Sequence, residues 1–314
     1  MSNWLYMKKI ILGCLCIVAI NSVSCAQSTP QVCFVGWDND DAVYWIHDQQ
    51  TVLTKLSGYA TANSIAVVGS DVYIIGMDGE DAVYWLNGKR TLLPTTSDRV
   101  SVEAIAATDK DVYIAGMDGE DAVYWLNGKR TLLPTTSDRV RVLAIATTYK
   151  DVYITGMDGE NAVYWVNGHQ KVLPTTSSDF NNYASSITVS GSDVYISGID
   201  GEDAVYWLNG RQTVLPKISG YAMANAIVVV GSDVYISGSD GEDAVYWLNG
   251  QRTVLPRSSS LWERANTNVI TTIGANIYIA GWDGDDAVYW LNGSRIALPK
   301  TSWSAGVSAI AFIP

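Results

Sequence analysis

The sequence predicts an all-β fold made of seven copies of one unit, and three observations support this prediction. First, residues 77–100 and 117–140 are the same twenty-four residues, MDGEDAVYWLNGKRTLLPTTSDRV. Second, looser copies recur at a period close to 40 residues, each marked by the first aspartate of an acidic turn. Third, each copy contains short runs of β-branched and aromatic residues between turn residues, without the 3.6-residue apolar period of a helix. Strand-built repeats of this length are typical of a seven-bladed β-propeller, with one blade per copy.

Each copy contains four expected strands, which in the second copy are residues 63–69, 71–77, 81–87 and 90–94. All four are rich in residues that favour strands. Gly and Ser separate the first two strands, Asp-Gly-Glu the next two, and Asn87-Gly88, a strong hairpin signal, the last two. Pro94 closes the fourth strand, and proline is tolerated in a sheet where no ladder donor is lost. The fourth strand is therefore expected at the outer edge of each blade.

The two ends of the repeat region predict how the ring closes. The first copy begins at residues 32–38, which match the second strand of a blade, and residues 307–313 match a first strand that has no successor. We expect Val307 to Ile313 to pair beside Phe34 to Trp37 and so complete one blade. This pairing would remove two open sheet edges. Residues 27–314 are thus expected to form a single domain.

The architecture resembles that of WD-repeat and kelch propellers, although the chain has neither the GH and WD dipeptides of the first nor the glycine doublet of the second. The unit DVYIxGxDGEDAVYWLNGxR is similar to repeats in exported bacterial β-propeller proteins of unassigned function, and the resemblance covers Gln31 to Pro314. It implies a propeller fold and export from the cytoplasm. It implies no activity, because a fold of this kind does not specify a function.

Residues 1–26 are typical of a signal peptide. Two lysines precede an apolar run at residues 10–20, and small residues follow around Cys25. The run is too short to cross a bilayer, so we expect no transmembrane span in the mature chain. Met7 is an alternative start of translation to Met1, because MKKIILG is a usual opening of a signal peptide. Two outcomes stay open: cleavage after Ala26 with release of a soluble protein, or a lipid anchor at Cys25, although Ser22 replaces the leucine common in lipoprotein signals. The expected location is the periplasm, the cell surface or the medium.

The chain is acidic, with a formal net charge of -12. This balance argues against nucleic acid as a partner, because phosphates require a basic surface. In a four-stranded blade, the turns between the second and third strands share one face with the links between blades. We call this the link face, and we expect it to carry most of the acidic residues. The lysines and arginines near the turns between the third and fourth strands, including Arg90, Arg130, Arg211, Arg252 and Arg295, are expected on the opposite face.

The acidic turns raise one weak cofactor hypothesis, calcium. Three acidic groups within four residues offer the oxygen ligands that calcium prefers. The alternative is that aspartate and glycine only shape the hairpins and keep the protein soluble, since the turns lack the spacing of known calcium loops. The candidate ligands are Asp38, Asp40, Asp78, Asp118, Asp158, Asp200, Asp240 and Asp283.

Tryptophans break the sevenfold symmetry at ring closure. The residue before the turn aspartate is Met77, Met117, Met157, Ile199 or Ser239 in five copies, but it is Trp37 or Trp282 in the two copies that meet. Trp262 and Trp303 lie in the links beside them. Exposed aromatic residues often anchor a partner, so these four tryptophans are the predicted ligand-binding residues. The alternative is that they reinforce the closure by packing.

The sequence therefore favours an exported, non-enzymatic protein that binds a protein or peptide on its acidic link face, whose charge suits a cationic partner. The alternative is a lectin-like propeller with repeated carbohydrate sites between blades. An enzyme is not expected, because His47 and His169 lie in distant copies and no pair of acids departs from the repeat. Cys33 takes the place of a strand residue and is expected to be a small buried core residue.

Overall fold

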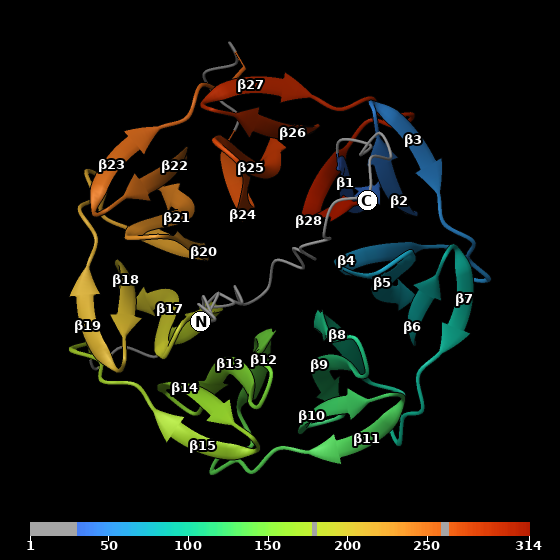
Figure 1. Ribbon diagram of the computed structural model, residues 1–314, viewed down its shortest axis with the longest axis horizontal. Helices are drawn as coiled ribbons and strands as arrows, with labels where there is room; N and C mark the ends of the chain where they lie inside the picture. The colour runs from blue at the N-terminus through green and yellow to red at the C-terminus, as the bar shows by residue number, and fades with distance from the viewer. Residues whose placement is uncertain (1–29, 178–180, 259–263) are drawn as a thin grey trace, which may run out of the picture.

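The computed structural model describes residues 30–177, 181–258 and 264–314, which form seven four-stranded antiparallel sheets. Figure 1 shows the sheets arranged around one axis as the blades of a propeller, with the first strand of each blade innermost and the fourth outermost. The prediction of an all-β, seven-bladed propeller is confirmed. None of the described residues belongs to a helix long and apolar enough to cross a membrane. The predicted signal peptide, residues 1–26, lies outside the described ranges.

The blades are numbered in chain order, and their strands are given from the axis outward. Blade 1 contains β28 (Ala305–Ile313), β1 (Gln31–Asp38), β2 (Asp41–Ile46) and β3 (Gln49–Val52). Blade 2 contains β4 (Ala60–Val68), β5 (Asp71–Asp78), β6 (Asp81–Leu86) and β7 (Lys89–Leu92). Blade 3 contains β8 (Val100–Ala107), β9 (Val112–Asp118), β10 (Asp121–Leu126) and β11 (Lys129–Leu132). Blade 4 contains β12 (Val140–Thr147), β13 (Val152–Asp158), β14 (Asn161–Val166) and β15 (His169–Val172).

The remaining blades follow the same plan. Blade 5 contains β16 (Asn182–Ser190), β17 (Asp193–Asp200), β18 (Asp203–Leu208) and β19 (Arg211–Val214). Blade 6 contains β20 (Ala222–Val230), β21 (Asp233–Asp240), β22 (Asp243–Leu248) and β23 (Gln251–Val254). Blade 7 contains β24 (Ala265–Ile273), β25 (Asn276–Asp283), β26 (Asp286–Leu291) and β27 (Ser294–Ala297). In blade 2 the innermost strand begins three residues earlier than expected, and the outermost strand ends before Pro94.

The ring closes as the sequence predicts, by pairing of β28 with β1. Phe34 lies opposite Ile310 and Gly36 opposite Val307, and the pairing extends from Gln31 with Ile313 to Asp38 with Ala305. The ring of Phe34 also stacks on that of Tyr289 in blade 7, with 4.6 Å between ring centroids. The strand that completes blade 1 therefore comes from the far end of the repeat region.

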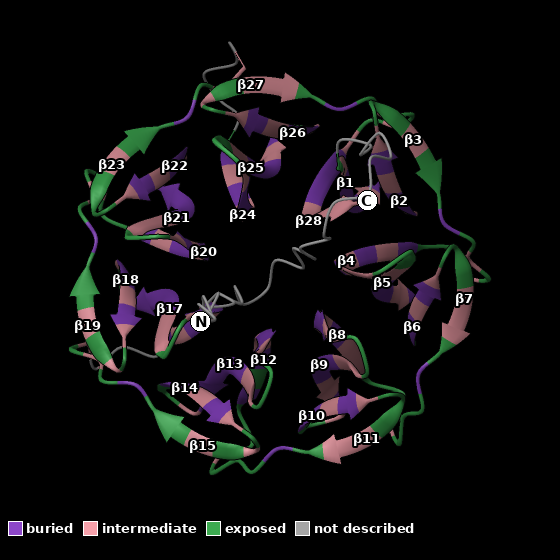
Figure 2. Cartoon of the chain, viewed as in Figure 1, coloured by how far each residue is buried: buried purple, intermediate pink, exposed green. Residues whose placement is uncertain are grey.

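The hydrophobic core lies between neighbouring blades and not within any one of them. Trp85 of blade 2, for example, packs in one cluster with Ala42 and Leu53 of blade 1 and with Ile74 and Val83 of its own blade. Figure 2 shows the result, with largely exposed outermost strands and largely buried middle strands. The seven tryptophans at this repeat position are fully buried: Trp45, Trp85, Trp125, Trp165, Trp207, Trp247 and Trp290.

The hairpin signals also behave as predicted. Asn87 and Gly88 have φ angles of 49° and 82°, the left-handed pair that a tight hairpin with this sequence requires. In blade 1 the same turn is formed by His47 and Asp48, with φ angles of 49° and 58°. Cys33 is buried, as expected, and burial raises the pKa of its thiol to about 12. It is a core residue and not a reactive one.

Candidate binding face

The acidic turns and the links between blades share one face, as predicted. In blade 2 the carboxylate of Asp78 accepts hydrogen bonds from the backbone amides of Leu56 at 2.8 Å and Ser57 at 2.9 Å, both in the link that enters the blade. Each of the seven turn aspartates accepts at least one such bond from the link that leads into its own blade. The turn aspartates therefore hold the links in place.

A tryptophan in each blade holds the same link at a second point. The indole Nε1–H of Trp85 donates to the carbonyl oxygen of Thr54 at 2.8 Å, and Trp45 donates to Pro299 at 2.7 Å. The other five tryptophans donate to the proline carbonyls of their own entering links at 2.7–2.8 Å. Two side chains of every blade thus fix the chain that arrives from the previous blade.

The turn aspartates are buried, and hydrogen bonds lower the pKa of several of them. Asp38 is 2% exposed, and burial alone would raise the pKa of its carboxyl group. Hydrogen bonds from Gln50, Ser302 and Thr301 outweigh burial and lower this pKa from 3.8 to about 2. The pKa of Asp78 is about 2 for the same reasons, with Ser57 and Arg90 among its donors.

These contacts give the calcium hypothesis no support. Asp38, Asp78, Asp118, Asp158, Asp200, Asp240 and Asp283 are at most 3% exposed and accept internal hydrogen bonds. The eighth candidate, Asp40, is exposed and accepts a bond from the amide of Asn39 at 2.8 Å. Within residues 30–177, 181–258 and 264–314, no three His, Cys, Asp or Glu side chains form a group that could hold a metal ion.

The predicted division of charge between the faces needs one correction. Four arginines that the sequence placed on the opposite face extend along the blade to the link face. The Nε atom of Arg90 lies 2.5 Å from Asp78, and Arg130, Arg252 and Arg295 contact their own turn aspartates at 2.5–2.6 Å. The link face is therefore less acidic than its turns suggest, and its uncompensated charge comes from exposed acids such as Asp40 and Asp285.

Of the predicted binding tryptophans that the structure describes, Trp37, Trp282 and Trp303, the last is the most exposed, at 72%. Its link is nevertheless held in place: Lys300 donates to the carbonyl oxygens of Asp285 at 2.8 Å and Trp303 at 3.1 Å, and pairs with Asp286 at 2.9 Å. The neighbouring Thr301 amide donates to Asp38 at 2.7 Å. The indole is thus presented to solvent by an ordered backbone.

Trp37 and Trp282 are half-buried and lie at equivalent positions of blades 1 and 7. Trp37 is opposite Gly306 in the sheet, and its ring is so close that a Cβ on that glycine would come within 2.8 Å of it. Trp282 is opposite Asn266. Trp37 therefore packs against β28, the strand that closes the ring, while Trp282 pairs within its own blade. Trp262 lies outside the described residues.

The sequence did not indicate two cavities that open between blades on the link face. One, of about 530 Å³, lies between blades 2 and 3 and is lined by Tyr59, Met77 and Met117 among others. The other, of about 570 Å³, lies between blades 4 and 5 and includes Arg139, Arg141 and Tyr183. The sequence signal that could have indicated these cavities is variation between copies. It occurs at the start of each innermost strand and in the link that precedes that strand.

Comparisons with known proteins identify the fold and no more. No family model matches the chain, and no curated protein is significantly similar to it. Many solved structures are similar in shape, and three of them are described below. The structure of a nidogen/laminin complex matches with a TM-score of 0.53 and 11% identity, over 91% of this chain and 99% of that one. The extracellular domain of the putative hybrid two-component system BT4673 from B. thetaiotaomicron matches with a TM-score of 0.52 and 10% identity, over 90% of this chain and 38% of that one.

The third structure is the computationally designed Ika8 protein, with a TM-score of 0.51, 14% identity and coverage of 89% of this chain and 90% of that one. At such low identities these similarities concern the fold alone. They agree with the sequence resemblance to propeller repeat proteins of unassigned function.

Proposed function

We propose that this protein is an exported, non-enzymatic binding scaffold that recognises a cationic segment of a protein or peptide on its link face, with Trp303 as the apolar anchor. The observation that carries the proposal is the contrast at Trp303, whose side chain is 72% exposed while its link is fixed by Lys300 and Asp38. Export rests on the signal-peptide pattern of residues 1–26.

A fixed, exposed indole suits binding because little conformational freedom is lost when a partner covers it. Tryptophan is also among the residues that most often dominate the free energy of binding. At the equivalent link positions of blades 2 and 6 the chain has Gly58 and Gly220, which also receive a lysine hydrogen bond on their carbonyl oxygens. Trp303 is therefore a substitution at a site where the link geometry requires no large side chain.

The surroundings of Trp303 favour a positively charged partner. Asp285 and Asp40 are exposed on the adjacent turns of blades 7 and 1, and the chain as a whole has a net charge of -12. A field of this sign attracts cationic groups and speeds their encounter with the face. The half-buried rings of Trp37 and Trp282 add apolar surface on the same face.

The test is an affinity measurement on a partner isolated from the cell envelope with the wild-type protein. We expect Trp303→Ala to weaken binding about thirtyfold, which corresponds to roughly 2 kcal/mol for an anchoring tryptophan. Binding should also weaken as salt is added. The matched control is Tyr149→Ala, which removes an aromatic ring that is 87% exposed in the turn between β12 and β13 on the opposite face.

The proposal fails if Trp303→Ala leaves the affinity unchanged, or if Tyr149→Ala weakens binding equally. It also fails if Trp303→Ala lowers the melting temperature, because the ring would then stabilise the fold.

A further inference from the structure

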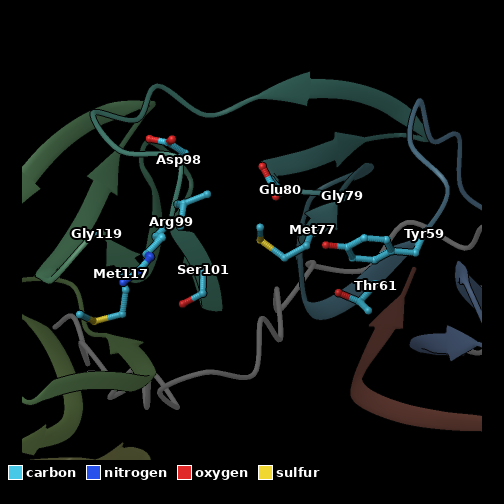
Figure 3. A pocket seen from close by; sticks show the side chains of 11 residues that line it. Tyr59, Thr61, Met77, Gly79, Glu80, Asp98, Arg99, Ser101, Met117 and Gly119 are labelled. Carbon is cyan, nitrogen blue, oxygen red and sulfur yellow. The ribbon is translucent and has the colours of Figure 1, made fainter.

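The cavity between blades 2 and 3 has an apolar wall and a polar rim (Figure 3). The phenol ring of Tyr59, which is 50% exposed, and the thioether of Met77 come from blade 2 and its link. Met117 and Ser101 come from blade 3. Gly79 and Gly119 lie at the turns that border the cavity and carry no side chain to narrow it. Its volume of about 530 Å³ is in the range of small-molecule sites.

The polar side chains of this cavity have no partners within the part of the chain that the structure describes. Nearby, Asp78 is saturated by Ser57, Leu56 and Arg90. By contrast, six cavity residues make no side-chain hydrogen bond and no ion pair with any described residue: Tyr59, Thr61, Glu80, Asp98, Arg99 and Ser101. The cavity therefore offers a set of hydrogen-bonding groups that the fold itself does not use.

These groups combine donors and acceptors with little net charge. Glu80 and Asp98 accept hydrogen bonds, Arg99 donates them, and the three hydroxyl groups do both. A cationic ligand would meet Arg99, and an anionic ligand would meet Glu80 and Asp98. A neutral ligand with many hydroxyl groups and one apolar face satisfies the whole set, because it can lie on Tyr59 and Met77 while its edges reach the polar rim.

We propose that this cavity is a binding site for a neutral pyranose sugar. The site lies outside the tryptophan cluster at ring closure and goes beyond the function proposed above. Tyr59 is the stacking platform, and Glu80, Asp98 and Arg99 bind the sugar hydroxyl groups.

Comparing the residues at equivalent positions of the blades predicts one sugar site per chain. The lectin alternative, by contrast, expects repeated sites. Among the described residues, the position of Tyr59 is taken by a second tyrosine only in blade 6, as Tyr221, and the hydroxyl group of Tyr221 already accepts a hydrogen bond from the side-chain amide of Asn181. Between blades 3 and 4, Arg99 replaces the tyrosine and Arg141 replaces Ser101, so that position has no aromatic platform. The cavity between blades 4 and 5 contains Arg139 and Arg141 and differs from the proposed site in charge.

The exact duplication of residues 77–100 at 117–140 supplies matched controls. Glu80 and Asp98 have the counterparts Glu120 and Asp138, which lie in the same local sequence one blade further on. The test uses titration calorimetry and saturation-transfer NMR with the methyl glycosides of glucose, galactose, mannose and N-acetylglucosamine. The variants are Tyr59→Ala and the double change Glu80→Gln with Asp98→Asn, compared with Tyr221→Ala and the double change Glu120→Gln with Asp138→Asn.

We expect at least one glycoside to bind at one molecule per chain. Its affinity should fall at least tenfold in both blade 2 variants and stay within twofold of wild type in both controls, with unchanged melting temperatures throughout. Three results would each overturn the proposal: no glycoside binds, about seven molecules bind per chain, or the control variants lose affinity as much as the test variants. Because Trp303→Ala leaves this cavity intact, a failure here is separate from a failure of the proposed partner site.

Discussion

At the scale of single residues, the turn aspartates show how one side chain can serve as a structural acceptor within an acidic surface. Asp78 lies in a turn with two other acids, yet it is 2% exposed and contacts Ser57 and Arg90. The pKa values of Asp118, Asp158, Asp200 and Asp240 are lowered in the same direction, because hydrogen bonds outweigh the opposing effect of burial. The negative charges nearest the links are therefore part of the fold.

This arrangement predicts loss of stability in acid. A carboxyl group with a folded pKa of about 2 and an ordinary value of 3.8 stays ionised in the folded state while the unfolded state takes up protons. The stability that these groups contribute is complete above about pH 4 and falls as the pH drops toward 2. Urea unfolding at pH 6, 4, 3 and 2 measures it.

The control for the acid prediction is Asp78→Asn. This variant should be less stable than wild type at pH 6, and its stability should fall less steeply between pH 4 and pH 2, because one titrating group has been removed. Equal slopes for the two proteins would contradict the role given to Asp78.

The residue scale also shows what the sequence could not reveal. The sequence places Arg90 just after a turn on the opposite face. Its side chain is long, and where the guanidinium group arrives depends on the twist of the sheet. Its contact with Asp78 could therefore not be predicted from the sequence. The sugar cavity was missed for a related reason. It combines Tyr59 with Ser101, which lie in different copies and meet only when two blades pack.

At the scale of elements, the link is the part of each repeat that is fixed from outside. The turn aspartate and the buried tryptophan of one blade both form hydrogen bonds with the backbone of the link that arrives from the previous blade, as Asp158 and Trp165 do in blade 4. Strands, turns and their order were predictable because β-branched runs and Asn-Gly pairs act locally. The hydrogen bonds that hold the links were not predictable from the sequence, because they depend on which backbone groups lie near those side chains after folding.

Removing one indole donor should therefore weaken the contact between two blades. We expect Trp165→Phe to destabilise the protein by about 2 kcal/mol or more, because the Pro134 carbonyl loses its donor and the smaller ring leaves space in the core. Guanidinium unfolding midpoints measure the change. Trp303→Phe, at an exposed position, should change stability by less than about 0.5 kcal/mol. Similar losses in the two variants would refute the distinction between them.

At the scale of the whole molecule, each blade buries its core only against its neighbours, so stability depends on an unbroken ring. Repetition made this architecture predictable from sequence, since seven copies with an incomplete blade at each end admit one simple closure. Repetition does not reveal how single copies differ. The two proposed binding sites both rest on departures from the repeat: Trp303 in one case, and in the other Tyr59, whose position is a tyrosine in only one other described copy, as Tyr221.

Deletion of residues 307–314 should open the ring. The loss exposes the edge of β1 and removes Val307, which is fully buried, from the cluster between blades 7 and 1. We expect a loss of about 4 kcal/mol or more and a clear fall in melting temperature, measured by calorimetry. A truncated protein that melts at the wild-type temperature would show that β28 is not needed for closure.

The pairing of β28 with β1 also determines how the ring responds to force. Gln31 and Ile313 face each other at one end of this antiparallel pair, so a pull between them would separate the strands one hydrogen bond after another, as a zipper opens. Trp303 precedes the other end of β28, where Ala305 faces Asp38. A partner that pulls on Trp303 against an anchor ahead of Gln31 would instead load all the hydrogen bonds of the pair together, in shear. The same closure is therefore weak toward tension applied at Ile313 and strong toward tension applied through the proposed binding site.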